Sequence, residues 1–348
     1  MKLESLEGVR GFAAVYVLLH HLNPLAGTPF EPILKFGQEA VILFFLVSGF
    51  VIAYSQIGAR AKRSPLGFLE HRAIRIYPIF LISMVLAAFA AAVSGRSECI
   101  STKAVIGNLL MLQDIAFLKS GTWVEPFCSN SPLWSLSYEW WFYVAFAVLF
   151  ASDRLSMKAR RIGVAAASLF GTVLFLLHPS QPLLFASYFS LWWAGLELSL
   201  EFVHRKKTSF RAQRFPIFLL VACAAIWAIP VVQALVSGGP LSLGREPVLQ
   251  LRHFLAGIVF MLLAIIGSRI DIVPKKVIRL CSLAAPVSYG LYASHQPVIQ
   301  LVQQLNLNWY VNLVTTVALA FAVAYILEIV IQPRIARWLS KPKITLNT

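Results

Sequence analysis

Long apolar stretches alternate with short polar segments along the whole chain. A helix that crosses a membrane needs about 20 mostly apolar residues. Ten stretches approach this length, at residues 6–22, 40–57, 76–93, 133–151, 162–177, 183–202, 215–236, 248–267, 280–302 and 311–331. The pattern therefore predicts an all-α, polytopic membrane helix bundle of about ten transmembrane helices, in a single integral-membrane domain that occupies residues 1–348.

One further apolar segment, Ala104–Leu118, contains Asn108, Gln113 and Asp114. Such polar side chains are costly in lipid. We therefore expect this segment to lie at the membrane interface or to re-enter the membrane. An eleventh span is the alternative, and it would invert the orientation of every helix that follows.

The composition supports a membrane protein, and the charge distribution predicts its orientation. Hydrophobic residues make up 58% of the chain and charged residues only 13%, and the net charge is +15. Too little polar surface exists for a soluble or a disordered protein. If the N-terminus is cytoplasmic, twenty-three of the 30 Lys and Arg lie on the cytoplasmic side and six lie outside. This follows the positive-inside rule, so we expect both termini in the cytoplasm and no nucleic-acid partner.

The four cysteines include no Cys-x-x-Cys pair, so the sequence contains no zinc or thiol-redox motif, and we expect no metal. Cys99 and Cys128 fall in the same predicted external loop. A disulfide between them is compatible with an oxidising compartment, and two free thiols are the alternative.

Ionisable residues inside predicted spans are candidates for function, because burying them in lipid is costly. In the first helix, Arg10 and His21 are eleven residues apart. They therefore share a helix face, about 16 Å apart along the axis. His20 points to another face. The structural alternatives are a topology-setting charge for Arg10 and an ordinary interfacial histidine for His21.

Arg72 and Arg75 begin the third predicted helix and, at i and i+3, are neighbours on one face. They lie at the depth of Arg10, so three guanidinium groups could hold a polyanion, because Arg binds phosphate with two parallel hydrogen bonds. The alternative is again charge that only sets the topology.

Polar residues also occur toward the external side of the predicted bundle. Glu139 needs a partner there, and His21 and His295 are the candidates. Ser48 precedes a glycine at similar depth, where small residues permit close helix approach. Three other acidic residues near cytoplasmic helix ends are predicted to pair with Arg or Lys: Glu197, Glu201 and Glu328.

At these residues the chain resembles the membrane-bound acyltransferase-3 family, whose multi-pass enzymes acylate cell-surface carbohydrates. Five segments carry the resemblance, in the family's order: Arg10…His21, Phe44–Phe50, Arg72–Arg75, Leu133–Glu139 and Ser288–Pro297. The resemblance implies an acyl-CoA donor on the cytoplasmic side. It further implies that His21 is catalytic and that Arg72 and Arg75 bind the donor.

The residues and the resemblance together predict a mechanism. Arg72, Arg75 and Arg10 hold the phosphates of acyl-CoA, and His21, oriented by Glu139, removes a proton from a carbohydrate hydroxyl. Ser48, Tyr289 and His295 are expected in the substrate pocket.

Acetyl is the simplest acyl group, and a surface or secreted carbohydrate, such as exopolysaccharide or lipopolysaccharide, is the expected acceptor. The expected location is a bacterial cytoplasmic (inner) membrane, with membrane lipid as a further partner. A proton-coupled secondary transporter without acyl transfer is the alternative, because intramembrane His and Glu also form proton relays. Transporters often contain inverted repeats, and the sequence shows no such symmetry.

Overall fold

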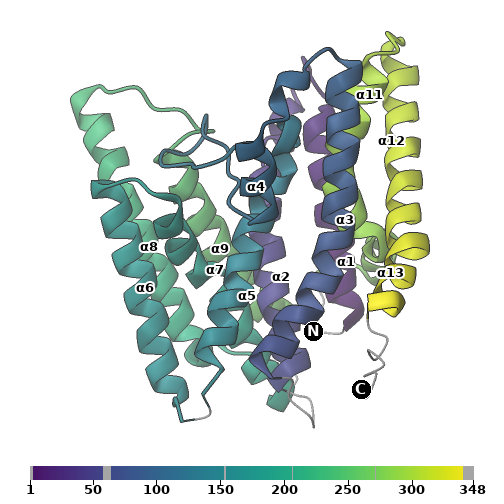
Figure 1. Ribbon diagram of the computed structural model, residues 1–348. Helices are drawn as coiled ribbons and strands as arrows, with labels where there is room; N and C mark the ends of the chain where they lie inside the picture. Colours follow the sequence, from purple (N-terminus) through teal and green to yellow (C-terminus); the bar gives the residue numbers. More distant parts are fainter. Residues whose placement is uncertain (1–2, 58–63, 153, 206, 271, 340–348) are drawn as a thin grey trace, which may run out of the picture.

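The computed structural model describes residues 3–57, 64–152, 154–205, 207–270 and 272–339 (Figure 1). These residues contain no strand, only an isolated bridge between Gln113 and Val124. The α-helices are α1 Leu3–Leu22, α2 Gly37–Ile57, α3 Pro65–Val93, α4 Thr102–Leu109, α5 Trp134–Leu149, α6 Met157–Leu177, α7 Gln181–Arg205, α8 Phe210–Ser237, α9 Val248–Gly267, α10 Lys275–Ser282, α11 Ser288–Gln303, α12 Trp309–Tyr325 and α13 Gln332–Leu339. The all-α prediction is confirmed.

Seven helical segments of the described chain are long and apolar enough to cross a membrane: Glu31–Gln56, Pro65–Val93, Met157–Leu177, Gln181–Val203, Phe210–Ser237, Val248–Gly267 and Trp309–Leu339. The other three predicted spans correspond to α1, α5 and α11. α5 and α11 have only 16 residues each, and α1 contains Glu4, Glu7 and Arg10. The count of ten therefore remains a prediction for these three helices.

The segment predicted to be interfacial or re-entrant contains one short helix. α4 has 8 residues, a length of about 12 Å, and an irregular segment follows it. An eleventh helical span at this place is therefore excluded. Asn108 holds the segment together, because its amide nitrogen donates to the carbonyls of Ala104 and Glu125 and its amide oxygen accepts from the backbone N–H of Phe127.

Two predicted spans differ from the observed helices. α3 begins at Pro65, eleven residues before the predicted start, because Ser64 caps it by accepting a hydrogen bond from the N–H of Gly67. Arg72 and Arg75 therefore lie within the helix. The predicted span 280–302 is broken, since α10 and α11 are separated by the 3₁₀ turn Ala285–Val287, which contains a proline that cannot donate a backbone hydrogen bond.

The helices form two groups around α2 and α5. In Figure 1, α6 to α9 lie on one side of these two helices, and α1, α3, α11 and α12 lie on the other. α2 packs closely against α7 through two glycines. A Cβ atom on Gly49 would lie 2.0 Å from the carbonyl oxygen of Trp192, and one on Gly195 would lie 1.9 Å from that of Leu46. The predicted close approach at Ser48-Gly49 is confirmed.

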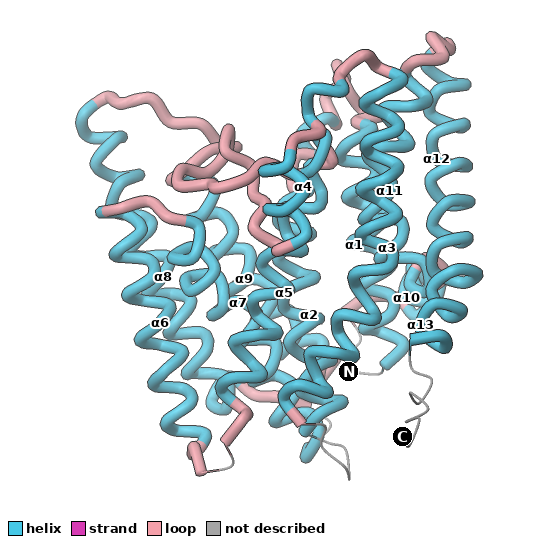
Figure 2. Tube along the Cα trace, in the orientation of Figure 1, coloured by secondary structure: helices cyan, strands magenta, loops and turns pink. Residues whose placement is uncertain are grey.

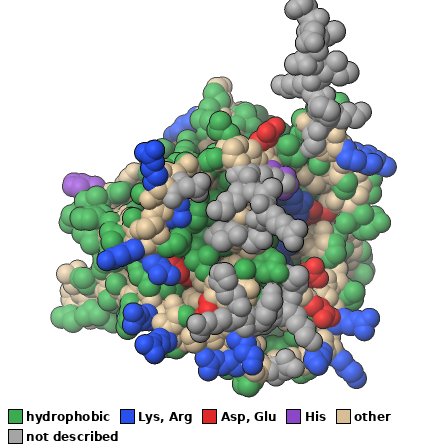
Figure 3. Space-filling model, turned by 90° about the horizontal axis from the view of Figure 1, so that it is seen from below, with side chains coloured by type: hydrophobic (Ala, Val, Ile, Leu, Met, Phe, Trp, Pro, Cys, Tyr) green, Lys and Arg blue, Asp and Glu red, His purple; other side chains and the backbone are tan. Residues whose placement is uncertain are grey.

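The two ends of the bundle differ in character. α1 begins and α13 ends at the same end (Figure 2), and Figure 3, which views that end, shows Lys and Arg side chains spread over it. The longer connections gather at the opposite end. Residues 1–2, 58–63 and 340–348 are outside the described chain, so the cytoplasmic location of the termini remains a prediction.

The two loop cysteines are paired. Cys99 and Cys128 form a disulfide, whereas Cys223 and Cys281 are free. The disulfide joins the segment after α3 to the segment before α5 and so restrains the connection between them. Of the two alternatives that the sequence left open, the disulfide is therefore the observed one.

Candidate functional site

A cavity of about 200 Å³ lies between α1, α2, α3, α5 and α11. Polar side chains from all five helices line it, and they include most of the residues that the sequence singled out. They are Arg10, Ser48, Arg72, Arg75, Ser135, Glu139, Tyr143, Ser288, Tyr289 and Tyr292. The predicted Arg cluster, Glu139 and two of the three predicted pocket residues therefore belong to one site.

Arg75 is held by a carboxylate from the far end of the chain. Its two terminal nitrogens contact the two carboxylate oxygens of Glu328 at 2.6 and 3.2 Å. Glu328 lies on the π-helical turn Ile326–Ile331 that joins α12 to α13, and its Oε1 also accepts from the N–H of Gly290 at 3.0 Å. The Arg75 guanidinium lies 5.5 Å from the centre of the Tyr289 ring. Arg75 is therefore fixed before any ligand binds.

Arg72 and Arg10 have different surroundings. Within the described chain Arg72 makes no ion pair. Its guanidinium carbon lies 5.6 Å from the centre of the Phe68 ring and 5.9 Å from the centre of the Tyr143 ring. Its Nε is buried without a hydrogen-bond partner there. Arg10 donates to the Ser288 hydroxyl at 3.1 Å. Arg72 is thus the cavity cation best able to receive an external anion.

Glu139 contacts neither of the histidines proposed as its partners. One of its carboxylate oxygens, Oε1, accepts from the hydroxyls of Ser48, at 2.9 Å, and Tyr143. The indole N–H of Trp192 in turn donates to Ser48 at 3.2 Å. The prediction that Glu139 orients His21 is therefore not met. The carboxylate accepts hydrogen bonds from Tyr143, one turn further along α5, and from Ser48 on the neighbouring helix α2 instead.

The histidine pair lies outside the cavity lining. The rings of His21 and His295 are 5.0 Å apart, with an angle of 66° between their planes. Each ring contacts a carbonyl oxygen four residues earlier through Nδ1, at 3.0 Å from Val17 and 2.9 Å from Leu291. A carbonyl can only accept, so both Nδ1 atoms carry a proton, and in the neutral form of each ring Nε2 has a free lone pair. Backbone carbonyls therefore orient both rings.

Two of the three acidic residues predicted to pair with basic residues do so. Glu328 pairs with Arg75, and Glu197 pairs with Arg161 at 2.7 Å. For Glu201 the prediction is wrong within the described chain. It accepts instead from the Thr208 hydroxyl and the Ser209 N–H, because the unpaired N–H groups at the start of α8 lie beside it.

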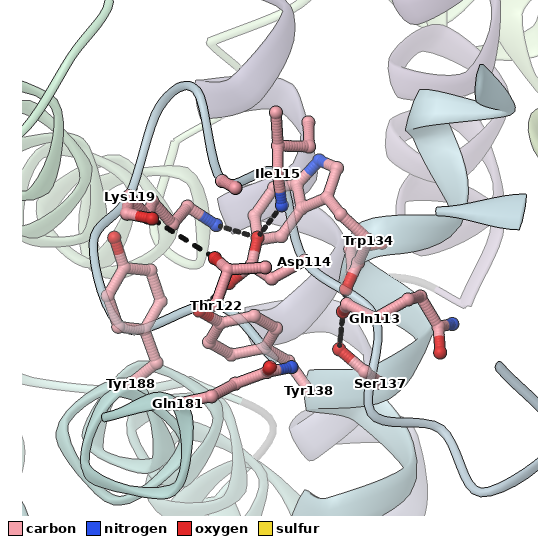
Figure 4. A network of polar contacts seen from close by, with 12 residues as sticks. Gln113, Asp114, Ile115, Lys119, Thr122, Trp134, Ser137, Tyr138, Gln181 and Tyr188 are labelled. Atoms are coloured by element: carbon pink, nitrogen blue, oxygen red, sulfur yellow. Dashed lines mark hydrogen bonds and ion pairs between the residues drawn. The ribbon is translucent and has the colours of Figure 1, made fainter. Parts of the chain in front are cut away.

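A second polar cluster, which the sequence did not reveal, joins the connection between α4 and α5 to α5 itself (Figure 4). The Lys119 ammonium contacts Asp114 at 2.9 Å and lies 3.5 Å from the centre of the Trp134 ring, with both charged side chains fully buried. Tyr138 donates to the other oxygen of Asp114 at 2.5 Å. Burial lowers the pKa of the Lys119 ammonium, and the Asp114 charge opposes that shift.

This second cluster has a structural role, because it attaches the connection to α5. Tyr138 is the neighbour of Glu139, so the cluster also helps to fix the start of α5, which lines the cavity. Asp114 and Lys119 are isolated charges in an apolar part of the sequence, and this was the available signal. Their pairing was not predictable, because the two residues lie five positions apart in a segment without regular secondary structure.

No group of three His, Cys, Asp or Glu in the described chain could hold a metal ion.

Comparison with known proteins gives a consistent family. A family model described as an acyltransferase domain matches residues 3–332. Acyltransferase MdmB of Streptomyces mycarofaciens is 33% identical over 184 residues, which are 50% of this chain and 46% of that protein. Nodulation protein 10 of Rhizobium leguminosarum bv. viciae is 26% identical over 182 residues, 46% of this chain and 48% of that protein. The matches thus cover about half the length of these relatives. No solved structure matches.

Proposed function

Because the chain belongs to the acyltransferase family whose domain matches residues 3–332, we propose that it is a membrane O-acyltransferase. It moves an acyl group, acetyl in the simplest case, from cytoplasmic acyl-CoA to a hydroxyl of a surface or secreted carbohydrate. The observation that carries this proposal is the cavity in which Arg10, Arg72 and Arg75 meet. This cavity gives a polyanionic donor a positively charged binding site in the core of the bundle.

Arg72 is the principal phosphate ligand in this proposal. It has no carboxylate partner in the described chain, and a guanidinium binds phosphate with two parallel hydrogen bonds. Arg75 uses both terminal nitrogens on Glu328 and contributes its remaining N–H groups and its position. Arg10, held by Ser288, adds a third positive charge. CoA enters from the end of the bundle that carries the predicted cytoplasmic loops.

His21 is the general base. Its Nδ1–H is donated to the Val17 carbonyl, so the lone pair on Nε2 is available to take a proton from the acceptor hydroxyl. The hydroxyl oxygen then attacks the thioester carbonyl carbon, the carbon–sulfur bond breaks, and the CoA thiolate leaves. Glu139, held by Ser48 and Tyr143, faces the cavity and helps to place the donor rather than to orient His21.

A multi-pass location in a bacterial cytoplasmic membrane, with ten spans and cytoplasmic termini, completes the proposal. Seven segments long enough to span a membrane and the basic end of the molecule support it. One of the relatives is named an acyltransferase, which favours transfer over the alternative of proton-coupled transport.

The deciding experiment compares glycans from cells that express the wild-type chain, the His21→Ala variant or neither. Mass spectrometry of surface and secreted carbohydrates should show an added acyl group only with the wild-type chain. Membrane vesicles containing the wild-type chain should also release CoA from acetyl-CoA. Unaltered glycans together with solute flux in vesicles that consume no acyl-CoA would establish a transporter instead.

A further inference from the structure

Two aromatic rings of the cavity lining, Phe44 and Tyr292, pack against each other, and the Tyr292 ring also lies beside His295. Ser288, Tyr292 and His295 are spaced i, i+4 and i+7, so they share one face of α11 over about 10 Å. Arg10 contacts Ser288 at one end of this face, and His21 lies against His295 at the other. Tyr292 is therefore the residue between the predicted donor end and the histidines.

Phe44, on α2, is the other ring of this pair. The rings of Phe44 and Tyr292 are 5.7 Å apart and meet edge to face, and the Tyr292 ring is 6.2 Å from that of His295. Phe44 and Tyr292 both line the cavity, whereas His21 and His295 do not. The line along α11 from the cavity to His295 and His21 therefore runs past the Tyr292 ring, against which the Phe44 ring packs.

The two rings differ in how firmly they are held. The Tyr292 hydroxyl donates to the Pro132 carbonyl at 2.6 Å and lies 2.8 Å from the Ser135 hydroxyl, and its side chain is buried. Phe44 has no polar anchor, is only half-buried, and packs against both hydrophobic clusters of the bundle. Tyr292 is thus held by hydrogen bonds, whereas Phe44 is held by packing alone.

We propose that the Phe44–Tyr292 ring pair selects the acyl group by length, so that short acyl groups reach His21 and longer ones are excluded. This inference rests on the proposed function and adds the determinant of its donor specificity. A short acyl group needs only a small displacement of the Phe44 ring. A longer chain needs space that the fixed Tyr292 ring and the packed core around Phe44 do not provide, since protein interiors leave few voids.

The test uses membrane vesicles that contain the full-length chain and the glycans of the expressing cells. Acetyl-, butyryl- and hexanoyl-CoA are supplied separately, and CoA thiol release is measured after subtracting the rate of the His21→Ala variant. The wild-type chain should prefer acetyl-CoA. Phe44→Leu should raise the butyryl-to-acetyl rate ratio about tenfold, the discrimination expected for one or two methylene groups, and Phe44→Ala should extend the change to hexanoyl-CoA.

Two further variants separate selection from general loosening of the bundle. Phe50→Leu makes the same change on α2 at a buried position that does not line the cavity, and it should leave the ratio unchanged. Tyr292→Phe keeps the ring but removes its anchor, and it should raise the ratio less than Phe44→Leu does.

The outcomes are distinct for the selection and for the activity itself. A wild-type ratio in folded Phe44→Leu and Phe44→Ala chains, or equal wild-type rates with all three donors, would overturn the selection while leaving acyl transfer intact. No His21-dependent release with any donor would overturn the proposed function, and the selection with it.

Discussion

Arg75 and Glu328 form a two-point ion pair that joins α3 to the π-helical turn after α12, with nitrogen–oxygen distances of 2.6 and 3.2 Å. The two residues are 253 positions apart in a chain of 348 residues, so the pair joins two helical segments that are distant in the sequence. The Glu328 side chain is only 3% exposed. π-Helical turns frequently occur at functional sites, and this one directs a carboxylate at a cavity-lining arginine.

Glu328→Gln should lower the thermal stability of the detergent-solubilised chain. The amide keeps an oxygen for the Gly290 N–H but leaves Arg75 without its counter-ion, at a cost of about 1–3 kcal/mol. Glu31→Gln is the control, because its ion pair with Lys35 is exposed and such pairs contribute little. Equal melting temperatures for wild type and Glu328→Gln would show that the pair does not stabilise the bundle.

Arg72→Ala should weaken CoA binding about tenfold or more, since a hydrogen bond to a charged group contributes about 1.5–3 kcal/mol. Calorimetry on the purified chain with CoA alone measures this without any acceptor. Arg161→Ala removes an arginine that pairs with Glu197 away from the cavity, and it should leave the CoA affinity unchanged. Equal losses in the two variants would indicate a general effect of charge.

His21→Ala should reduce acyl transfer about 100-fold or more, the usual contribution of a general base, while CoA affinity stays the same. The separation is expected because His21 does not line the cavity. The exposed His178 provides the control, and His178→Ala should be fully active. A His21→Ala chain that acylates at the wild-type rate would remove this residue from the mechanism.

Gly49→Ala and Gly163→Ala should change stability in opposite directions. A Cβ at Gly49 meets the backbone oxygen of Trp192 at 2.0 Å, so α2 and α7 must separate, at a cost of about 1–3 kcal/mol. Gly163, in α6, has open space around its Cβ position, and alanine there should stabilise the helix by up to about 1 kcal/mol. Thermal unfolding of both variants tests the pair, and a stable Gly49→Ala chain contradicts the close packing.

Asp114→Asn should destabilise the chain by about 3–5 kcal/mol, because it leaves the Lys119 charge buried without its counter-ion. Adding Lys119→Met should recover most of that loss, since the double variant leaves no buried charge. If the double variant were no more stable than Asp114→Asn alone, the loss of stability would come from lost packing and hydrogen bonds rather than from the unpaired Lys119 charge.

The sequence by itself determined the features that depend on local periodicity and composition. The apolar stretches predicted the helices, the spacing of Arg72 and Arg75 placed them on one face of α3, and the polar residues at 104–118 predicted a segment that is not an eleventh helical span. Even there, the break in the span 280–302 was missed, because residues 283–287 around the proline turn are apolar and continue into α11, while only the last three residues of the amphipathic helix α10 fall within the predicted span.

Only the tertiary structure decided which polar groups meet. Glu139 accepts hydrogen bonds from Ser48 and Tyr143 rather than from His21. Arg75 forms an ion pair with Glu328, whereas Arg72 has no carboxylate partner in the described chain. The contacts across helices depend on the rotation and axial register of each helix. Register is set by packing, such as the glycine contact of α2 with α7 and the π-helical turn after α12. A periodic pattern of residues identifies which side chains share one face of a helix. Which other helix that face contacts is decided by the packing of the whole bundle.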